Sequence, residues 1–341
     1  MEVIPAFDRR PRAGRAGRPG RDRVVLPMAL HHLLILTKHP DDYQARIEAA
    51  GLPDLAIVAS ADVADGLARG AHSDVLLGDP TRVKAALPHL SRLVWTQLTW
   101  AGVEPMLDPA LRRDYVLTNI RGVFGPLMSE YVFGYLLAIE RKIVPRLESQ
   151  RAGRWDATLP GTLQGKTIGL VGVGSIGAHL AATGKHFGMR VHGYTRSSRD
   201  CRHVDRYFHG ADKAAFARDL DYLVAVLPNT GETAAIVDAG MLEALPPRAV
   251  VVNAGRGKTV DEAALVTALT TGRLAGAVLD VFPEEPLPET SPFWTTPNTW
   301  VTSHTSAPSF PADIVGVFVE NYRRFHRGEP LQHRVDFERG Y

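Results

Sequence analysis

Residues 167–177 read Thr-Ile-Gly-Leu-Val-Gly-Val-Gly-Ser-Ile-Gly, an apolar run that leads directly into closely spaced glycines. These glycines have the G-x-G-x-x-G spacing, a helix-forming segment follows over 175–187, and a second apolar run covers 190–194. In such a strand–turn–helix unit the glycines allow close approach of a pyrophosphate, to which the helix N-terminus presents N–H groups. A turn without a ligand is the alternative. The segment predicts a dinucleotide site whose turn is formed by Gly172, Gly174, Ser175, Ile176 and Gly177.

The residues after the second apolar run bear on the choice between NAD(H) and NADP(H). An acidic residue about 20 positions beyond the glycines would hold the adenosine ribose hydroxyls. This chain has Thr195 at that position, followed by Arg196 and Ser197, with Arg199 close by. No carboxylate would repel a 2′-phosphate, and a guanidinium can clamp one. The sequence therefore favours NADP(H) over NAD(H), the alternative being that both arginines are solvated loop charges.

Short apolar runs alternate with helical segments on both sides of the glycine turn, which is typical of α/β domains built on parallel sheets. Five strands are predicted before the turn and six from it onward. The fold class predicted is α/β with two Rossmann-like domains, in which a doubly wound dinucleotide-binding domain is inserted in a smaller, flavodoxin-like substrate domain. The predicted strands cover residues 33–36, 56–59, 74–77, 93–96, 115–118, 167–171, 190–194, 222–227, 249–253, 277–279 and 300–302.

The predicted substrate domain is discontinuous. It covers residues 28–120 and is completed by 306–341, because a helix expected near 311–326 follows the last strand and the first sheet needs a cover. The dinucleotide-binding domain is predicted over 121–305, and a long apolar helical segment from Gly125 to Gln150 lies near its start.

The composition is that of a globular protein with an unusual start. The 341 residues carry a net charge of +2, but residues 1–27 hold seven arginines against three acidic residues, so the rest of the chain carries −2. We expect 1–27 to be a disordered extension or sequence upstream of a start at Met28, with a nucleic-acid-binding tail as the alternative. The nearly equal numbers of basic and acidic residues in 28–341 argue against a nucleic-acid partner. No apolar run has the ~18 residues of a membrane span.

The number of cysteines bears on the cellular compartment of the protein and on whether it could bind a metal. The chain has a single cysteine, Cys201, which excludes an intramolecular disulfide and a cysteine-based zinc site. A reducing compartment is the simpler interpretation. We therefore expect a cytoplasmic protein without a metal.

Polar side chains capable of catalysis follow three predicted strands of the second series. Arg256 follows the strand over 249–253, Asp280 ends the next strand, and His304 follows the last one, while Glu285 lies in a proline-bracketed loop. Because the carboxyl ends of parallel strands meet at one edge of a sheet, we expect these side chains to lie near one ligand. A carbonyl that receives hydride needs a proton donor near neutral pH, and an imidazole beside a carboxylate is suited to that task.

Several motifs, in order, resemble the D-isomer-specific 2-hydroxyacid dehydrogenase family, and in particular its glyoxylate/hydroxypyruvate reductase branch. They are the glycine turn, Leu227-Pro-Asn-Thr230, Asn253-Ala-Gly-Arg-Gly257, Leu279-Asp-Val-Phe282 and the histidine at 304. The resemblance implies that Arg256 orients the substrate, that Glu285 rather than Glu284 pairs with His304, and that His304 is the general acid/base. It further implies that Asp280 holds the nicotinamide carboxamide and that backbone N–H groups of Ala101-Gly102-Val103 hold the substrate carboxylate. The remaining cofactor contacts implied are Leu227, Pro228, Thr230, Ala254, Gly255, Arg256 and His304.

The resemblance implies NAD(P)H-dependent reduction of a small 2-oxo acid to the D-2-hydroxy acid, with His304 as the proton donor and a homodimer formed through the long helical segment. A regulatory protein that keeps the dinucleotide as a structural ligand is one alternative, and a dehydrogenase of phosphite or formate is another. The family's usual proline before the histidine is replaced here by Ser303, and its glycines after it by Thr305-Ser306-Ala307. Trp100 and Phe124 are candidates for either the substrate pocket or the core.

Overall fold

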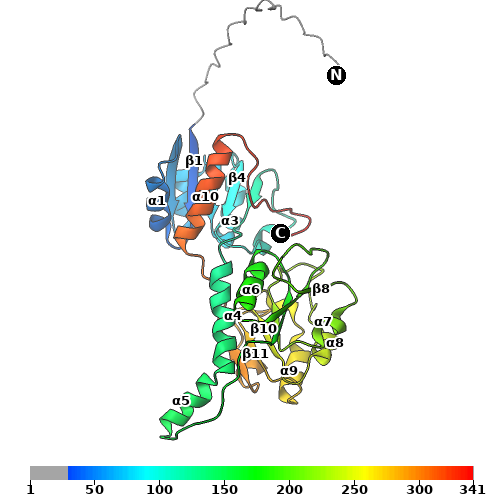
Figure 1. Cartoon of the computed structure of the whole chain (residues 1–341). Helices are drawn as coiled ribbons and strands as arrows, with labels where there is room; N and C mark the ends of the chain where they lie inside the picture. Colours follow the sequence, from blue (N-terminus) through cyan, green and yellow to red (C-terminus); the bar gives the residue numbers. More distant parts are fainter. Residues whose placement is uncertain (1–29, 341) are drawn as a thin grey trace, which may run out of the picture.

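The computed structural model describes residues 30–340, which form two α/β units, drawn one above the other in Figure 1. The upper unit contains a five-stranded sheet with strand order β2-β1-β3-β4-β5, and the lower unit a seven-stranded sheet with order β12-β11-β10-β9-β6-β7-β8. Every strand pair in both sheets is parallel. The predicted fold class is therefore correct. The predicted extension over 1–27 lies outside the described residues.

The five-stranded sheet contains an interior strand, β1, that is apolar on both faces. Leu33 to Leu36 are completely buried in β1, which explains why this run reads as continuous apolar sequence. The predicted strand over 93–96 begins two residues too early, because Leu93 packs in the core before the ladder starts at Trp95. The elements are β1 (His31–Leu36), α1 (Pro40–Ala49), β2 (Leu55–Ser60), α2 (Val63–Gly70), β3 (Val75–Gly78), α3 (Pro80–Ala86), η1 (Leu87–His89), β4 (Trp95–Leu98), η2 (Glu104–Leu107) and β5 (Val116–Thr118).

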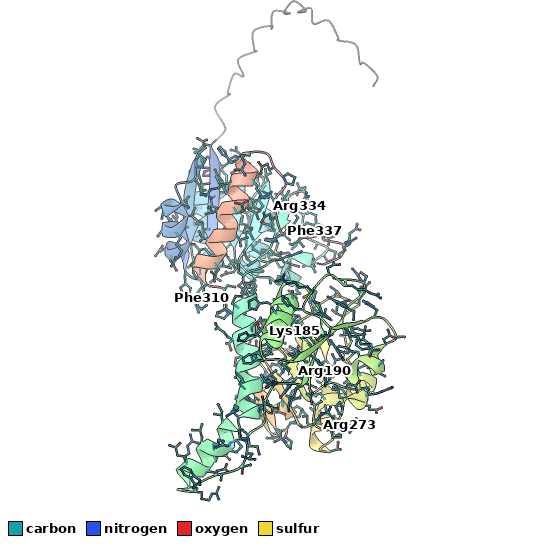
Figure 2. All side chains as sticks on the ribbon, viewed as in Figure 1. Lys185, Arg190, Arg273, Phe310, Arg334 and Phe337 are labelled. Atoms are coloured by element: carbon teal, nitrogen blue, oxygen red, sulfur yellow. The ribbon has the colours of Figure 1, made fainter. Side chains whose placement is uncertain are left out.

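The chain returns to this unit at its C-terminal end. Helix α10 (Pro311–His326) lies along the five-stranded sheet, and the ring of Phe318 stacks on Trp95 with centroids 5.2 Å apart. Beyond α10, Arg334 bridges Thr118 in antiparallel fashion, and Phe337 packs edge-on against Tyr115 (Figure 2). The five-stranded unit is thus built from two distant stretches of sequence.

The seven-stranded sheet contains the six predicted strands and one more. The prediction of six strands was wrong, because it missed β8 (Arg206–Phe208). This is a three-residue edge strand in which only Phe208 is buried. So short and half-exposed a strand leaves no apolar run in the sequence. The other elements are β6 (Thr167–Val171), α6 (Ser175–His186), β7 (Arg190–Tyr194), α7 (Lys213–Ala217), β9 (Tyr222–Ala225), α8 (Ala239–Ala244), β10 (Val250–Asn253), η3 (Gly257–Thr259), α9 (Glu262–Thr270), β11 (Gly276–Leu279), η4 (Pro292–Trp294) and β12 (Thr299–Val301).

The long helical segment predicted over 125–150 is two helices. Helix α4 (Gly125–Glu140) and helix α5 (Ile143–Arg151) are separated by Lys142, whose φ of 53° lies in the left-handed region. Helix α4 packs against α6, whereas α5 buries none of its residues and projects away from both units (Figure 1). Among residues 30–340, no helix is both long and apolar enough to cross a membrane.

Candidate active site

The glycine turn joins β6 to α6 and leaves no space for a side chain at two of its glycines. Gly172 has a φ of 102°, and a Cβ on Gly177 would overlap the carbonyl oxygen of Gly172, so neither position accepts a side chain without displacement. A Cβ on Gly174, in contrast, would meet nothing within 4 Å. Open space therefore lies beside the residue that precedes α6, whose first residues are Ser175 and Ile176. A pyrophosphate fits a helix N-terminus left open in this way.

Two further loops meet the glycine turn. A Cβ on Gly255 would lie 2.9 Å from the backbone nitrogen of Leu227, and one on Gly172 would lie 2.8 Å from the Leu227 side chain. Leu227 is thus enclosed between the turn after β6 and the loop after β10. The structure therefore brings Leu227 close to both Gly172 and Gly255, while Ala254 directly follows β10 and Pro228 and Thr230 continue the loop after β9.

The loop after β7 carries the residues predicted to select the cofactor. Thr195 is buried, and its hydroxyl donates to the carbonyl oxygen of Ser198 at 2.7 Å. The Arg196 guanidinium lies 2.8 Å from the carboxylate of Glu232, and both side chains are exposed. Arg199 donates to Nε2 of His209 at 2.8 Å. Ser197 is exposed on the same loop. Glu232 was not predicted, and it gives Arg196 an anionic partner from the loop after β9.

His304 and Glu285 form a hydrogen-bonded pair. Nδ1 of His304 lies 2.7 Å from Oε2 of Glu285, while Oε1 of Glu285 accepts from the backbone N–H of Phe282 at 2.9 Å. Because a carboxylate can only accept, Nδ1 carries the proton and Nε2 is left for another partner. Glu284 is exposed and has no hydrogen bond or ion pair within residues 30–340, so the geometry selects Glu285 over its neighbour.

Asp280 anchors the loop that carries His304. Its side chain is completely buried, and its carboxylate accepts from the Thr302 hydroxyl at 2.6 Å and from the backbone N–H groups of Thr305 and Ser306 at 2.9 and 3.0 Å. The backbone N–H of His304 also donates to the carbonyl oxygen of Asp280. Asp280 therefore fixes the conformation of this loop, in which His304 has a φ of 55°. The Tyr131 hydroxyl lies 2.8 Å from that of Thr302, and burial raises the pKa of this tyrosine, so it stays protonated.

Arg256 is held between the two units. Its Nε donates to Oε1 of Glu104 at 2.6 Å, and its Nη1 donates to the carbonyl oxygen of Gly255 at 2.8 Å. Glu104 begins η2, directly after the predicted substrate loop Ala101-Gly102-Val103. Burial acts to raise the pKa of Glu104, but the hydrogen bond and charge of Arg256, together with the charge of His304, lower it below its usual value. Glu104 was not predicted from the sequence.

The two aromatic candidates differ in their surroundings. Phe124 is buried in the core cluster of the five-stranded unit, where it contributes to packing. Trp100 is 46% exposed and directly precedes Ala101, so it is available at the substrate loop. Within the described part of the chain, no group of three or more histidine, cysteine or acidic side chains could hold a metal ion.

The chain is similar to known proteins in sequence and in structure. The family model described as "D-isomer specific 2-hydroxyacid dehydrogenase, NAD binding domain" matches residues 133–306. Glyoxylate/hydroxypyruvate reductase A of Klebsiella pneumoniae is 34% identical over 217 residues, which are 64% of this chain and 70% of that protein.

Solved structures show the same relationship. A D-isomer specific 2-hydroxyacid dehydrogenase family protein from Aeromonas salmonicida is 43% identical, with a TM-score of 0.87 over 91% of this chain and all of that chain. The NADPH-dependent glyoxylate/hydroxypyruvate reductase of Sinorhizobium meliloti, solved with NADP and sulfate, is 27% identical, with a TM-score of 0.79 over 91% of this chain and all of that chain. A family member from Xanthobacter autotrophicus, solved with NADPH, is 30% identical, with a TM-score of 0.80 over 92% of this chain and all of that chain. The chain belongs to the D-isomer specific 2-hydroxyacid dehydrogenase family and is an NAD(P)-dependent oxidoreductase.

Proposed function

We propose that this protein reduces a small 2-oxo acid, such as glyoxylate or hydroxypyruvate, to the D-2-hydroxy acid, with NADPH as the preferred reductant. The observation that carries the proposal is the His304–Glu285 pair, 2.7 Å apart, at the strand edge where Arg256 also lies. The similarity to the glyoxylate/hydroxypyruvate reductases of Klebsiella pneumoniae and Sinorhizobium meliloti supports the same substrate class.

His304 would act as the general acid. Its Nδ1–H is held by Glu285, which fixes the orientation of the ring and directs Nε2 away from the carboxylate. Nε2 of the imidazolium gives its proton to the carbonyl oxygen, and the ring becomes neutral until it is reloaded from water. Proton donation by a positioned side chain contributes roughly 10²–10⁴-fold to rate.

Arg256 and the backbone of residues 101–103 would hold the substrate. Nη2 of Arg256 lies so close to Gly102 that a Cβ there would overlap it. A guanidinium beside backbone N–H groups can bind a carboxylate and also stabilise the negative charge that develops on the carbonyl oxygen.

The cofactor would lie along the carboxyl ends of β6, β7, β9 and β10. The open space at Gly174 suits the pyrophosphate, and Arg196 suits a 2′-phosphate. When bound, the reduced nicotinamide supplies the hydride for the carbonyl carbon. The NADP and NADPH held by the Sinorhizobium and Xanthobacter relatives support NADP(H) over NAD(H) here.

We also propose a cytoplasmic homodimer. A single cysteine suits a reducing compartment. The projecting α5 and the segment after it expose large apolar side chains, with Trp155 96% and Leu159 85% accessible. Exposed apolar area of this kind indicates an interface, and a second copy of the chain is the occupant we propose.

A substrate panel tests the reaction. Purified protein is assayed with glyoxylate, hydroxypyruvate and larger 2-oxo acids in the presence of NADPH or NADH, and with formate or phosphite in the presence of NADP⁺. We expect turnover of the smallest 2-oxo acids, faster with NADPH. Tight NADPH binding with no turnover of any acid would instead support the regulatory alternative, and oxidation of phosphite or formate alone would support another dehydrogenase.

A further inference from the structure

The contact between Glu104 and Arg256 joins the two units of the molecule. The residues are 152 positions apart, and their side chains are 33% and 27% exposed. Glu104 belongs to the five-stranded unit, whereas Arg256 follows β10 of the seven-stranded unit. A half-buried pair of this kind is less screened by salt than a surface pair.

The guanidinium of Arg256 is held at two of its three nitrogens. Nε donates to Glu104 and Nη1 to the carbonyl oxygen of Gly255, and Nη2 has no acceptor among residues 30–340. Because the guanidinium is planar and rigid, fixing Nε and Nη1 also fixes the direction of the Nη2 hydrogens. The free donor group is therefore the one beside Gly102.

Gly102 is required for this arrangement. A Cβ at position 102 would overlap Nη2 of Arg256 and would lie 2.7 Å from Oε2 of Glu104. The guanidinium and the carboxylate thus both press against the backbone of the predicted substrate loop. Glu104 stays ionised in the neutral range, because its pKa is lowered by Arg256 and His304 despite its burial.

We propose that Glu104 is a positioning residue that holds Arg256 so that Nη2 remains beside the backbone of residues 101–103 to receive the substrate carboxylate. This inference rests on the proposed reduction of 2-oxo acids. Glu104 itself touches Arg256 rather than the reacting atoms. The negative charge of Glu104 also neutralises the positive charge of Arg256. Substrate binding therefore depends on the direction in which the Nη2 hydrogens of Arg256 point more than on a net positive charge.

The test compares wild-type protein with Glu104→Ala, Glu104→Gln and the matched control Asp108→Ala. Asp108 directly follows the same short helix η2 and pairs with Lys84 at 2.9 Å, so its removal also breaks an ion pair of the five-stranded unit. The readouts are kcat and KM for glyoxylate, KM for NADPH, Tm, and the Kd of oxalate in the presence of NADP⁺. Oxalate is a small carboxylate that cannot be reduced, so its Kd reports binding alone.

We expect Glu104→Ala to raise both the KM for glyoxylate and the Kd of oxalate about tenfold or more, as loss of a charge-assisted hydrogen bond does. The KM for NADPH should not change, and Tm should change no more than in Asp108→Ala. Glu104→Gln keeps a side-chain oxygen that can accept from Nε, so it should restore most of the oxalate affinity.

Three results would overturn the inference. Tighter oxalate binding in Glu104→Ala would mean that Glu104 competes with the substrate for Arg256, and equal effects of Glu104→Ala and Asp108→Ala would mean a structural role only. Wild-type protein that binds oxalate but reduces no 2-oxo acid would refute the proposed function, while the oxalate comparison would still decide the role of Glu104. Wild-type protein that does neither would overturn both.

Discussion

Glu285 links its own turn to His304: one carboxylate oxygen accepts from the Phe282 N–H at 2.9 Å, and the other lies 2.7 Å from Nδ1 of His304. The backbone contact holds the carboxylate in place before the imidazole engages it. Glu284, the adjacent residue, is exposed and has no such contact in the described part of the chain.

The first prediction concerns this pair. Glu285→Gln should lower kcat for 2-oxo acid reduction by about 10²-fold, because a neutral amide holds the proton-donating imidazole less firmly than a carboxylate does. Steady-state kinetics with glyoxylate and NADPH measure the change. Glu284→Gln is the matched control and should behave as wild type. A similar loss in both variants, or in neither, would remove Glu285 from the proposed mechanism.

The second prediction concerns the cofactor. Arg196→Gln should raise the KM for NADPH about tenfold or more while leaving the KM for NADH little changed, because only NADPH has the 2′-phosphate. Arg202→Gln, on the same exposed loop, controls for general loss of positive charge.

Glu232→Gln extends this experiment in the opposite direction. Removing the carboxylate 2.8 Å from Arg196 should lower the KM for NADPH, because this carboxylate competes with the 2′-phosphate for the guanidinium. Unchanged NADPH/NADH ratios in both variants would show that cofactor choice depends on other residues.

The fold could be predicted because its central strands are buried on both faces. Runs such as Leu33 to Leu36 are continuously apolar, and glycines mark the turn after β6. The edge strand β8 was missed because only Phe208 in it is buried, so it leaves no apolar run in the sequence. The break between α4 and α5 at Lys142 did have a signal, because Pro145 follows it in the first turn of α5, where a proline is tolerated.

Sequence motifs predict those residues of the candidate site that lie within them, but not the contacts between distant segments. His304 and Arg256 lie just after the ends of β12 and β10, and Glu285 lies in the loop after β11, but the contact between Glu104 and Arg256 depends on how the two units meet. No local pattern encodes a contact 152 residues apart. The anchoring of the His304 loop by Asp280 was also missed, because the sequence showed an acidic residue at a strand end and not the backbone N–H groups around it.

The third prediction concerns the dimer. Replacing Trp155 and Leu159 together by serine should convert the protein to a monomer, because both side chains are almost fully exposed in the single chain. Helix α5 buries no residue of its own, so the folded core of the chain should be unaffected. Light scattering after size-exclusion chromatography gives the mass. Phe310→Ser, which removes an exposed aromatic side chain at the start of α10 in the five-stranded unit (Figure 2), is the control and should leave the mass unchanged. A monomeric wild type would exclude the proposed assembly.

The last prediction concerns stability below neutral pH. His192 lies in β7 with its Nδ1 buried and without a hydrogen-bond partner in residues 30–340, and its ring packs 5.4 Å from that of Phe208. Burial, together with the charge of Arg206, lowers the pKa of His192 below its usual 6.5. The unfolded chain therefore takes up a proton near pH 6.5 that the folded chain does not, so the free energy of unfolding must fall as pH decreases through this range.

His192→Phe should reduce this pH dependence, because phenylalanine fills the same apolar site without titrating. Urea unfolding of both proteins between pH 7.5 and about 5 measures the slope. The pKa of His333 is also lowered, by burial and by the charge of Arg121. Part of the pH dependence of the free energy of unfolding should therefore remain in His192→Phe. His89, an exposed histidine of η1, is the control, and His89→Phe should leave the slope as in wild type. Identical slopes in wild type and His192→Phe would show that His192 is protonated equally in the folded and unfolded chains.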